Sequence, residues 1–304
     1  MIFVYHNILS DCPTQRDVSG KTGLPRHRFE QQLRWLLTHR QIVPLSKYLE
    51  LREHERGLRS NLVALTFDDG LRSTFERVYP LLRRWKVPAT LFISTAHLQP
   101  GRLLWFSYLN ALCFERIYAR ICLRGISFSF RSDIERKMAR RSLGVMARSS
   151  RNPKAFIEEL AAAYPLPAAI ATEYEGMSAR QLTLLGGSDF LEGGAHTVNH
   201  PYLDQLSNEE QEKEIVVSKE QLAELTGKRV RYFAYPGGGY NKDTLQLLKA
   251  AGFEAAFATH EQRIGADNQF EIVRVGVYSV SFIKFWLKAQ GVAKLAHRYG
   301  LGKP

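Results

Sequence analysis

The stretch Leu62-Val63-Ala64-Leu65-Thr66-Phe67-Asp68-Asp69-Gly70 carries the clearest information about the fold. It is an apolar run of strand length that ends in two adjacent carboxylates and a glycine. Two carboxylates this close raise the pKa of one of them unless a cation balances their charge. A metal ion would supply that balance, with one carboxylate bound to it and the other left free as a base. The alternative is a solvated surface turn, because Asp-Gly is a common turn pair.

Similar apolar runs recur along the chain and alternate with segments of helical periodicity. This rhythm predicts parallel strands joined by helices, and 304 residues suit one large α/β barrel or two small domains. We expect strands at residues 2–5, 41–45, 62–67, 89–94, 190–194, 230–235, 254–258 and 272–277. We expect helices at residues 28–38, 73–84, 208–226 and 242–251.

Residues 101–177 interrupt the alternation with a long, Arg-rich and mostly helical pattern. We interpret them as an insertion on a loop of one barrel domain that spans residues 1–280. The tail that follows, residues 281–304, mixes Phe285, Trp286 and Leu287 with several lysines. It is predicted either to pack against the barrel or to lie as a basic amphipathic helix on a membrane surface.

Composition narrows the class of partner. The net charge of +12 suits an anionic partner such as an acidic polysaccharide, lipid headgroups or nucleic acid. The basic stretch 116–154 has no helix-turn-helix, finger or RNA-binding signature, so nucleic acid is not expected, and this stretch reads as a solvated helical face. No run of 18 apolar residues and no secretory signal is visible, which predicts a cytoplasmic protein with membrane contact only at its periphery.

A second motif, His196-Thr197-Val198-Asn199-His200, follows the Gly-rich end of an expected strand. Two histidines four residues apart can direct their imidazoles at one ion, and Pro201 favours a tight loop over a helix here. Two unrelated surface histidines are the alternative. Together with one aspartate, the pair makes a set of three ligands that leaves positions open for water and substrate, as catalytic zinc sites require.

A third motif spans residues 233–240, from an expected strand into an expected helix. Its glycines let the backbone approach a ligand, and free N–H groups there can hold an oxyanion, although a plain connecting loop has the same composition. The polar residues of all three motifs come directly after strands, and His6 ends the first strand. In a parallel barrel the carboxyl ends of strands meet on one face, so these residues are expected to meet there.

The three motifs together resemble those of the polysaccharide deacetylases, the NodB-homology group called carbohydrate esterase family four, over residues 1–96 and 178–278. The resemblance implies a distorted (β/α) barrel of about seven strands that removes N-acetyl groups from a polysaccharide or amino sugar in surface polysaccharide metabolism. It implies Asp69, His196 and His200 as ligands of a divalent metal, usually zinc, and Asp68 as the general base. It also implies an oxyanion contact from the N–H of Gly237 and a substrate-binding role for the neighbouring residues Tyr235, Pro236, Gly238 and Tyr240.

The sequence departs from the family pattern in two places. The family's third motif usually carries an arginine that positions the base, but Ala234 stands there, and Arg274 is the best substitute unless it makes an ordinary salt bridge. The family's late Leu-x-His motif, which supplies the general acid, is missing. Tyr5-His6 resembles the start of a permuted subgroup, so His6 is the candidate acid and His260 the reserve; His97 reads as incidental. The family's hydrolases of non-sugar amides, or a sugar-binding pseudoenzyme, remain alternatives.

Overall fold

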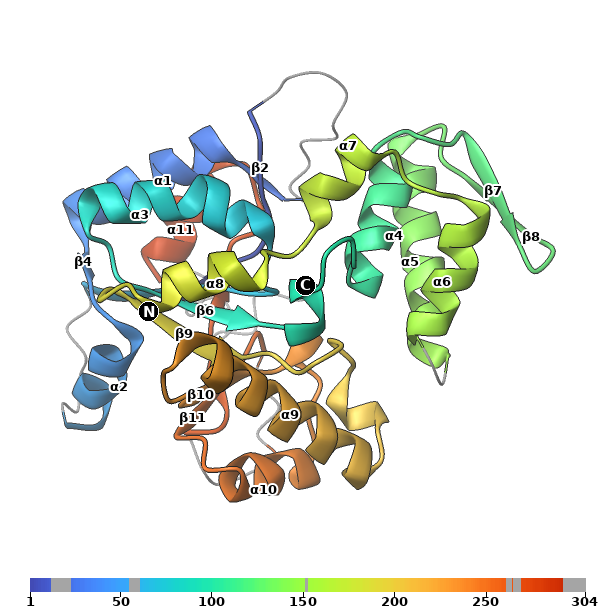
Figure 1. Ribbon diagram of the computed structural model, residues 1–304. Coiled ribbons are helices and arrows are strands. Elements are labelled where there is room, and N and C mark those ends of the chain that lie inside the picture. The colour runs from blue at the N-terminus through green and yellow to red at the C-terminus, as the bar shows by residue number, and fades with distance from the viewer. Residues whose placement is uncertain (12–22, 55–60, 151–152, 261–263, 265–268, 292–304) are drawn as a thin grey trace.

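The expected strands assemble into one strongly curved parallel sheet in the computed structural model, which describes residues 1–11, 23–54, 61–150, 153–260, 264 and 269–291 (Figure 1). Eight strands follow one another around the sheet in the order β12-β11-β10-β9-β6-β5-β1-β13, and β4 also pairs with β5. Their bounds are β1 Ile2–Tyr5, β4 Gln41–Ile42, β5 Leu62–Phe67, β6 Ala89–Ile93, β9 Leu191–Ala195, β10 Tyr232–Ala234, β11 Ala255–Ala258, β12 Ile272–Val273 and β13 Val275–Gly276.

The two end strands nearly close this sheet into a barrel. Only Arg274 separates β12 from β13, and these strands pair with β11 and β1, at opposite ends of the strand order. The predicted distorted α/β barrel is therefore confirmed. The expected strand 272–277 is interrupted at one residue, and the expected strand 41–45 is shorter because Leu45 already begins helix α2. Every residue of β5 is buried, as in a parallel strand covered on both faces.

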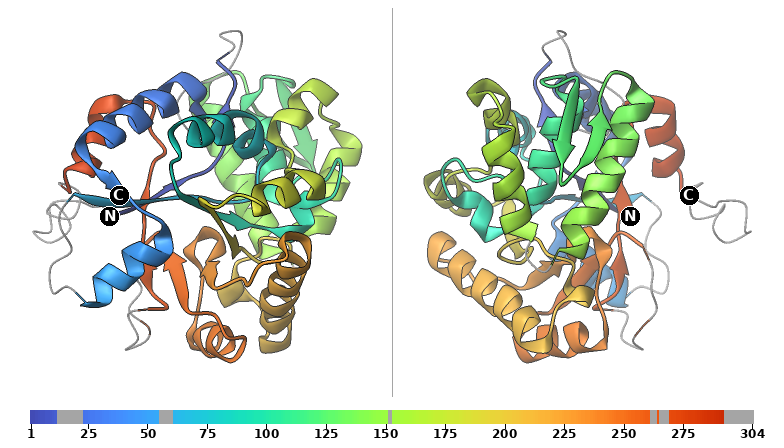
Figure 2. Two further views of the ribbon diagram at one scale, coloured as in Figure 1. Left: turned by 60° about the vertical axis from the view of Figure 1, so that its left-hand side comes forward. Right: turned by 90° about the vertical axis from the view of Figure 1, so that its right-hand side faces the viewer.

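Helices connect the strands and cover the outside of the sheet (Figure 2). Their bounds are α1 Arg26–His39, α2 Leu45–His54, α3 Tyr79–Trp85, α8 Ala179–Gly186, α9 Asn208–Thr226, α10 Lys242–Ala250 and α11 Phe282–Ala289. The expected helix 73–84 divides into a π-helical turn, Thr74–Val78, followed by α3. Capping boxes fix the starts of α9 and α10, at Ser207 and Asn241, where the sequence predicted them.

One end of the barrel is covered by helix α2. Leu45, Tyr48 and Leu49 of α2 pack with inward-facing residues from the amino-terminal ends of strands, such as Ile2 and Leu62. Helix α2 therefore covers the amino-terminal end of the barrel. The carboxyl ends of the strands, where the three motifs lie, are left for a functional site.

The segment between β6 and β9 builds its own small hydrophobic core, visible as the green elements of Figure 1. It contains α4 Trp105–Phe114, the antiparallel hairpin of β7 Arg120–Leu123 and β8 Ile126–Ser129, α5 Asp133–Ser149, α6 Pro153–Ala163 and α7 Ala168–Ala171. The sequence pattern predicted the helices but not the hairpin. A second small pairing, of β2 Ile8–Leu9 with β3 Leu24–Pro25, lies outside the barrel sheet. Single 3-10 turns occur at Thr95–Leu98, Thr172–Tyr174, Leu203–Gln205 and Pro236–Gly238.

The described part of the predicted tail, α11, packs against the barrel. Phe285 and Ala289 are buried, and the ring of Phe285 lies 5.8 Å from that of Phe3. The rest of the tail, residues 292–304, lies outside the described residues. Among the helices that are described, none combines the length and the apolar character needed to cross a bilayer.

Candidate metal centre

The turn after β5 presents Asp69 in a backbone conformation that few residues adopt. Asp69 has φ 76° and Gly70 has φ 69°, both in the left-handed region that aspartate and glycine tolerate best. A side chain at Gly70 would collide with Ile93 of the neighbouring strand β6. The N–H of Met177 donates to the Gly70 carbonyl at 2.9 Å. The backbone conformation of this turn thus favours aspartate at position 69 and glycine at position 70, in addition to any role of the carboxylates in binding a metal.

The turn after β9 presents His196 and His200. Thr197 and His200 also have positive φ, 65° and 58°, and the N–H of His200 donates to Thr197 Oγ1 at 3.0 Å. The indole N–H of Trp105, from α4, donates to the His200 carbonyl at 3.0 Å. The residues form a tight turn and not a helix, as Pro201 indicated.

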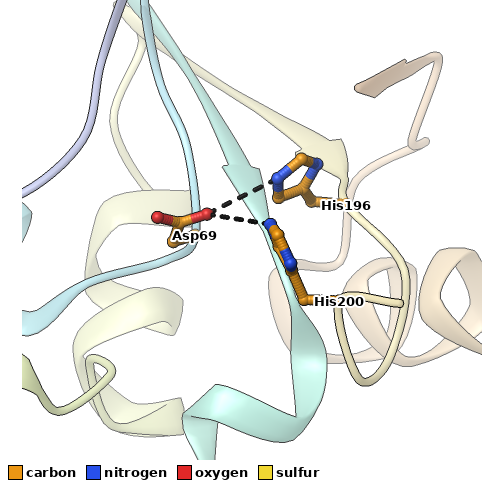
Figure 3. A group of neighbouring side chains, drawn as sticks. All are labelled: Asp69, His196 and His200. Carbon is orange, nitrogen blue, oxygen red and sulfur yellow. Dashed lines mark ion pairs between the residues drawn. The ribbon is translucent and has the colours of Figure 1, made fainter. Parts of the chain in front are cut away.

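The two turns bring three buried side chains together (Figure 3). Asp69 Oδ1 lies 3.5 Å from His196 Nε2 and 3.5 Å from His200 Nε2. His196 Nδ1 lies 2.7 Å from the Ala234 carbonyl, so the ring proton sits on Nδ1 and Nε2 turns a lone pair toward Asp69. Asp69 Oδ1 is buried and makes no hydrogen bond. Such converging lone pairs repel one another unless a cation lies between them, so this triad fits a divalent metal ion.

The pKa shifts of Asp69 and His200 also suit a metal. Burial raises the pKa of Asp69, but contact with His196 and the charges of the nearby histidines outweigh it and leave the pKa below its usual value. Burial lowers the pKa of His200 to about 3. A carboxylate and a neutral imidazole are the forms in which these residues bind metals.

Asp68, next to the triad, is held by Arg274. Two parallel bonds join Arg274 Nη1 to Asp68 Oδ1 and Nη2 to Oδ2, both at 2.6 Å, and both side chains are fully buried. Arg274 reaches Asp68 from the gap between β12 and β13 and lies over the ring of Phe92, 5.0 Å from its centroid. Burial raises the pKa of Asp68, but the Arg274 charge outweighs it and lowers the pKa overall. Asp68 is therefore an ionised carboxylate outside the metal triad.

His6 also lies close to Asp68. Its Nε2 is 3.9 Å from Asp68 Oδ2. His6 and Asp69 line one cavity of about 140 Å³, together with Asn7, Tyr278 and three residues of α4, Phe106, Ser107 and Asn110. His260, the reserve candidate, is exposed, does not line this cavity, and has its ring beside Thr259. The fold thus brings His6, and not His260, to the two aspartates.

The third motif begins in β10, and its two tyrosines pack into the core. Tyr235 and Tyr240 are buried, their rings stack 4.2 Å apart, and their hydroxyls donate to the Phe270 carbonyl and to Glu271. Neither they nor Pro236, Gly237 and Gly238 line the cavity at Asp69. The motif's direct link to the triad is the Ala234 carbonyl that orients His196. The oxyanion and substrate-binding roles of these residues stay predictions.

Several residues that no sequence motif marked brace the two metal-binding turns. Glu214 of α9 accepts the N–H groups of Val198 and Asn199 at 2.8 Å each, and the Asn199 side-chain amide at 2.6 Å. His97, which read as incidental, is fully buried, and its ring nitrogens lie 3.1 Å from the carbonyls of Asp69 and Tyr174. Trp105 and Met177 belong to the insertion, which therefore contacts both metal-binding turns. No local pattern marked these residues, because their partners are distant in sequence.

Replacing Glu214 by glutamine is expected to weaken zinc binding by about 10- to 100-fold, the range for residues that orient metal ligands. The amide keeps the shape of the carboxylate but turns an NH2 group toward at least one of the three N–H donors, which loosens the turn that carries both histidines. Competition with a chromophoric chelator measures the affinity. Glu212→Gln, exposed on the same helix, is the control and should leave the affinity unchanged. Equal affinities of both variants would contradict a bracing role.

Comparison with known proteins agrees with the family resemblance of the three motifs. The family model described as polysaccharide deacetylase matches residues 55–129 and 170–256, just over half of the chain. The gap between the two matched segments falls inside the insertion. Poly-beta-1,6-N-acetyl-D-glucosamine N-deacetylase of Staphylococcus aureus (strain MSSA476) is 33% identical over 76 residues, which is 25% of this chain and 26% of that protein. This chain thus matches about a quarter of the length of that curated relative.

Two solved structures share the fold over nearly the whole chain. The deacetylase PplD of Streptococcus pyogenes, in complex with acetate, superposes with a TM-score of 0.60 at 18% identity and covers 95% of this chain and 96% of its own. IcaB from Ammonifex degensii gives a TM-score of 0.60 at 20% identity, with the same coverage of 95% and 96%. At these identities the likeness establishes the architecture only.

Proposed function

The chain belongs to the polysaccharide deacetylase family, and from this premise we propose that it is a metal-dependent hydrolase that removes N-acetyl groups from a polysaccharide or amino sugar. One observation carries the proposal. A buried Asp-His-His triad suited to a metal stands beside a second aspartate, which an arginine keeps ionised and apart from the triad.

The roles proposed for the residues follow from their positions. A divalent ion, most often zinc in such sites, would be held by Asp69, His196 and His200; when bound it polarises a carbonyl and makes water a better nucleophile. Asp68 accepts a proton from the water that attacks the acetyl carbonyl. His6 donates a proton to the sugar nitrogen as the C–N bond breaks. The products are acetate and a free amino sugar.

Two parts of this scheme rest on resemblance and position together. We propose that the chain follows the permuted arrangement of the family, with Tyr5-His6 supplying the acid and Arg274 replacing the arginine of the third motif. The 3.9 Å approach of His6 to Asp68 and the two bonds from Arg274 support these assignments. The N–H of Gly237 is proposed to hold the oxyanion on the strength of the motif.

The structure also has a cleft of about 720 Å³, whose lining residues do not include Asp69, His196 or His200. Trp105, Asn199 and Pro201 line it, so it borders the turn that carries His200, and α6 and α9 form its other walls. The S. aureus relative is named for a polymer of N-acetylglucosamine. A polymer of N-acetylated amino sugars is therefore the first substrate class to test.

Release of acetate tests the proposal. The full chain, loaded with zinc, is assayed on β-1,6-linked and β-1,4-linked N-acetylglucosamine oligomers and on simple non-sugar N-acetyl amides. Acetate from either oligomer supports the proposal. Acetate only from the non-sugar amides would move the chain to that branch of the family. Oligomer binding with no acetate from any compound would identify a sugar-binding protein without turnover.

Replacing His6 by glutamine is expected to lower kcat by about 10²- to 10⁴-fold, the usual contribution of a general acid, with zinc affinity preserved. Glutamine keeps a polar group of similar size in the cavity but cannot deliver a proton. The kcat for acetate release and the zinc content of the purified variant measure the two effects. His260→Gln is the matched control, and a larger loss in that variant would transfer the acid role to His260.

A further inference from the structure

The last described helix, α11, is apolar on two opposite faces. Phe285 and Ala289 form the face that packs against the barrel and α1. On the other side Ile283, Trp286 and Leu287 have exposed fractions of 69%, 41% and 38%. Residues three and four apart share one side of a helix, so these three side chains make a continuous outward apolar face. Core packing explains the inner face but gives no reason for the outer one.

The surroundings of this outward face are basic. Lys284 is exposed beside it, and Arg40, the residue after α1, donates to the carbonyl of Ala289 at the end of α11. No acidic residue follows Glu271 in the sequence, whereas the basic residues after it are Arg274, Lys284, Lys288, Lys294, Arg298 and Lys303. Arg274 is neutralised by Asp68, but every charged side chain after it in the sequence is basic, so the apolar face belongs to a positively charged segment.

We propose that the outward face of α11, formed by Ile283, Trp286 and Leu287, docks on the surface of an anionic lipid bilayer. A helix lying in the plane of a membrane presents tryptophan and aliphatic side chains to the acyl boundary and lysines to the headgroups. A second copy of this chain would bring like charges together. A nucleic acid would leave the apolar side chains without partners.

Docking in this way has a consequence for the substrate. Tyr278 lines the cavity at Asp69, and α11 begins only four residues later, at Phe282. Four residues span at most about 14 Å, so the first turn of α11 stays near the cavity. Helix α11 lies beside α1, on the side of the barrel away from α4 to α6 (Figure 2). A docked molecule would hold its metal centre close to the headgroups, where a membrane-bound or newly made polymer is found.

Vesicle sedimentation with the full chain tests the proposal. The vesicles are phosphatidylcholine alone or phosphatidylcholine with phosphatidylglycerol. The wild type is expected to sediment with the anionic vesicles, less so as salt is raised. The variant Ile283→Ser, Trp286→Ser, Leu287→Ser is expected to bind on the order of tenfold or more weakly, because it loses three insertable apolar groups. The control Ile134→Ser, Met138→Ser changes two strongly exposed apolar residues on α5 and should bind like the wild type.

The fluorescence of Trp286, taken as the difference between the wild type and Trp286→Phe, is expected to shift to the blue on anionic vesicles. Equal sedimentation of the wild type and the triple variant would overturn the proposal. It would also be overturned if the wild type were a dimer and the triple variant a monomer, because the outward face would then be a contact between two copies. Acetate release from soluble oligomers is measured in parallel, because the three residues lie outside the cavity. If the triple variant loses vesicle binding but still releases acetate, docking and reaction are independent. If the wild type binds vesicles but releases no acetate, the proposed reaction fails while the docking proposal stands.

Discussion

Replacing Asp69 or His200 by asparagine is expected to abolish both zinc binding and acetate release. Both residues have positive φ, which asparagine tolerates better than alanine does, so the substitutions remove a ligand without straining the turn. Each leaves only two of the three protein ligands that the triad supplies. We expect zinc affinity to fall by more than about 100-fold, beyond the range for residues that merely orient a ligand.

Zinc content by elemental analysis and acetate release are measured on the same preparations, together with the thermal midpoint. A chelator such as dipicolinate should produce the same loss in the wild type, and added zinc should reverse it there but not in the variants. Asp189→Asn, which changes an exposed aspartate, is the control for loss of charge. Acetate release that survives both the substitutions and the chelator would refute the metal-dependent scheme.

Replacing Arg274 by methionine is expected to cost activity and about 3–5 kcal/mol of unfolding free energy. Methionine fills much of the same space inside the barrel but leaves the Asp68 carboxylate buried without its partner. Breaking one side of a buried ion pair has a cost of this size, because the remaining charge has lost both its water and its counter-charge. Asp68→Asn should destabilise the protein for the same reason, since it leaves the Arg274 guanidinium unpaired.

The double variant Asp68→Asn, Arg274→Met separates stability from catalysis. It has no buried unpaired charge, so its unfolding free energy should recover most of the loss seen in either single variant. Its acetate release should stay as low as that of Asp68→Asn, because the proposed base is still missing. Denaturant unfolding and kcat are the measurements. Additive losses of stability in the double variant would show that the two charges are not coupled, contrary to the two 2.6 Å bonds.

Much of the fold could be predicted because it depends on local patterns. The strands at residues 2–5 and 62–67 and the helix at 208–226 have the bounds that their apolar periodicity and caps indicated. The placement of Asp69, His196 and His200 followed from one further rule, that the carboxyl ends of parallel strands meet on one face. To place each of these three residues, it was enough to predict the strand that ends just before it.

The bracing of the site could not be predicted in this way. Glu214 contacts a turn that lies 15 residues away in sequence, and Trp105 contacts one that lies 95 residues away. Sequence periodicity shows that each belongs to a helix, but not which turn that helix packs against. The hairpin β7–β8 was not predicted for a different reason. Each of its strands is only four residues long and lies within an Arg-rich segment, so its apolar alternation is weak.

Backbone propensity and apolar periodicity act over a few residues, so they indicate where the strands lie and which chemical groups follow them. The partners of those groups depend on the folded barrel. Arg274 and Asp68 are 206 residues apart and meet because Arg274 lies between β12 and β13, the two end strands that nearly close the sheet. His6 lies beside Asp68 because β1 and β5 are neighbouring strands in which Tyr5 stands opposite Phe67. His260 is exposed, and Tyr235 and Tyr240 are buried in the core. Which residues face each other across a barrel depends on strand order, and strand order is a property of the whole chain.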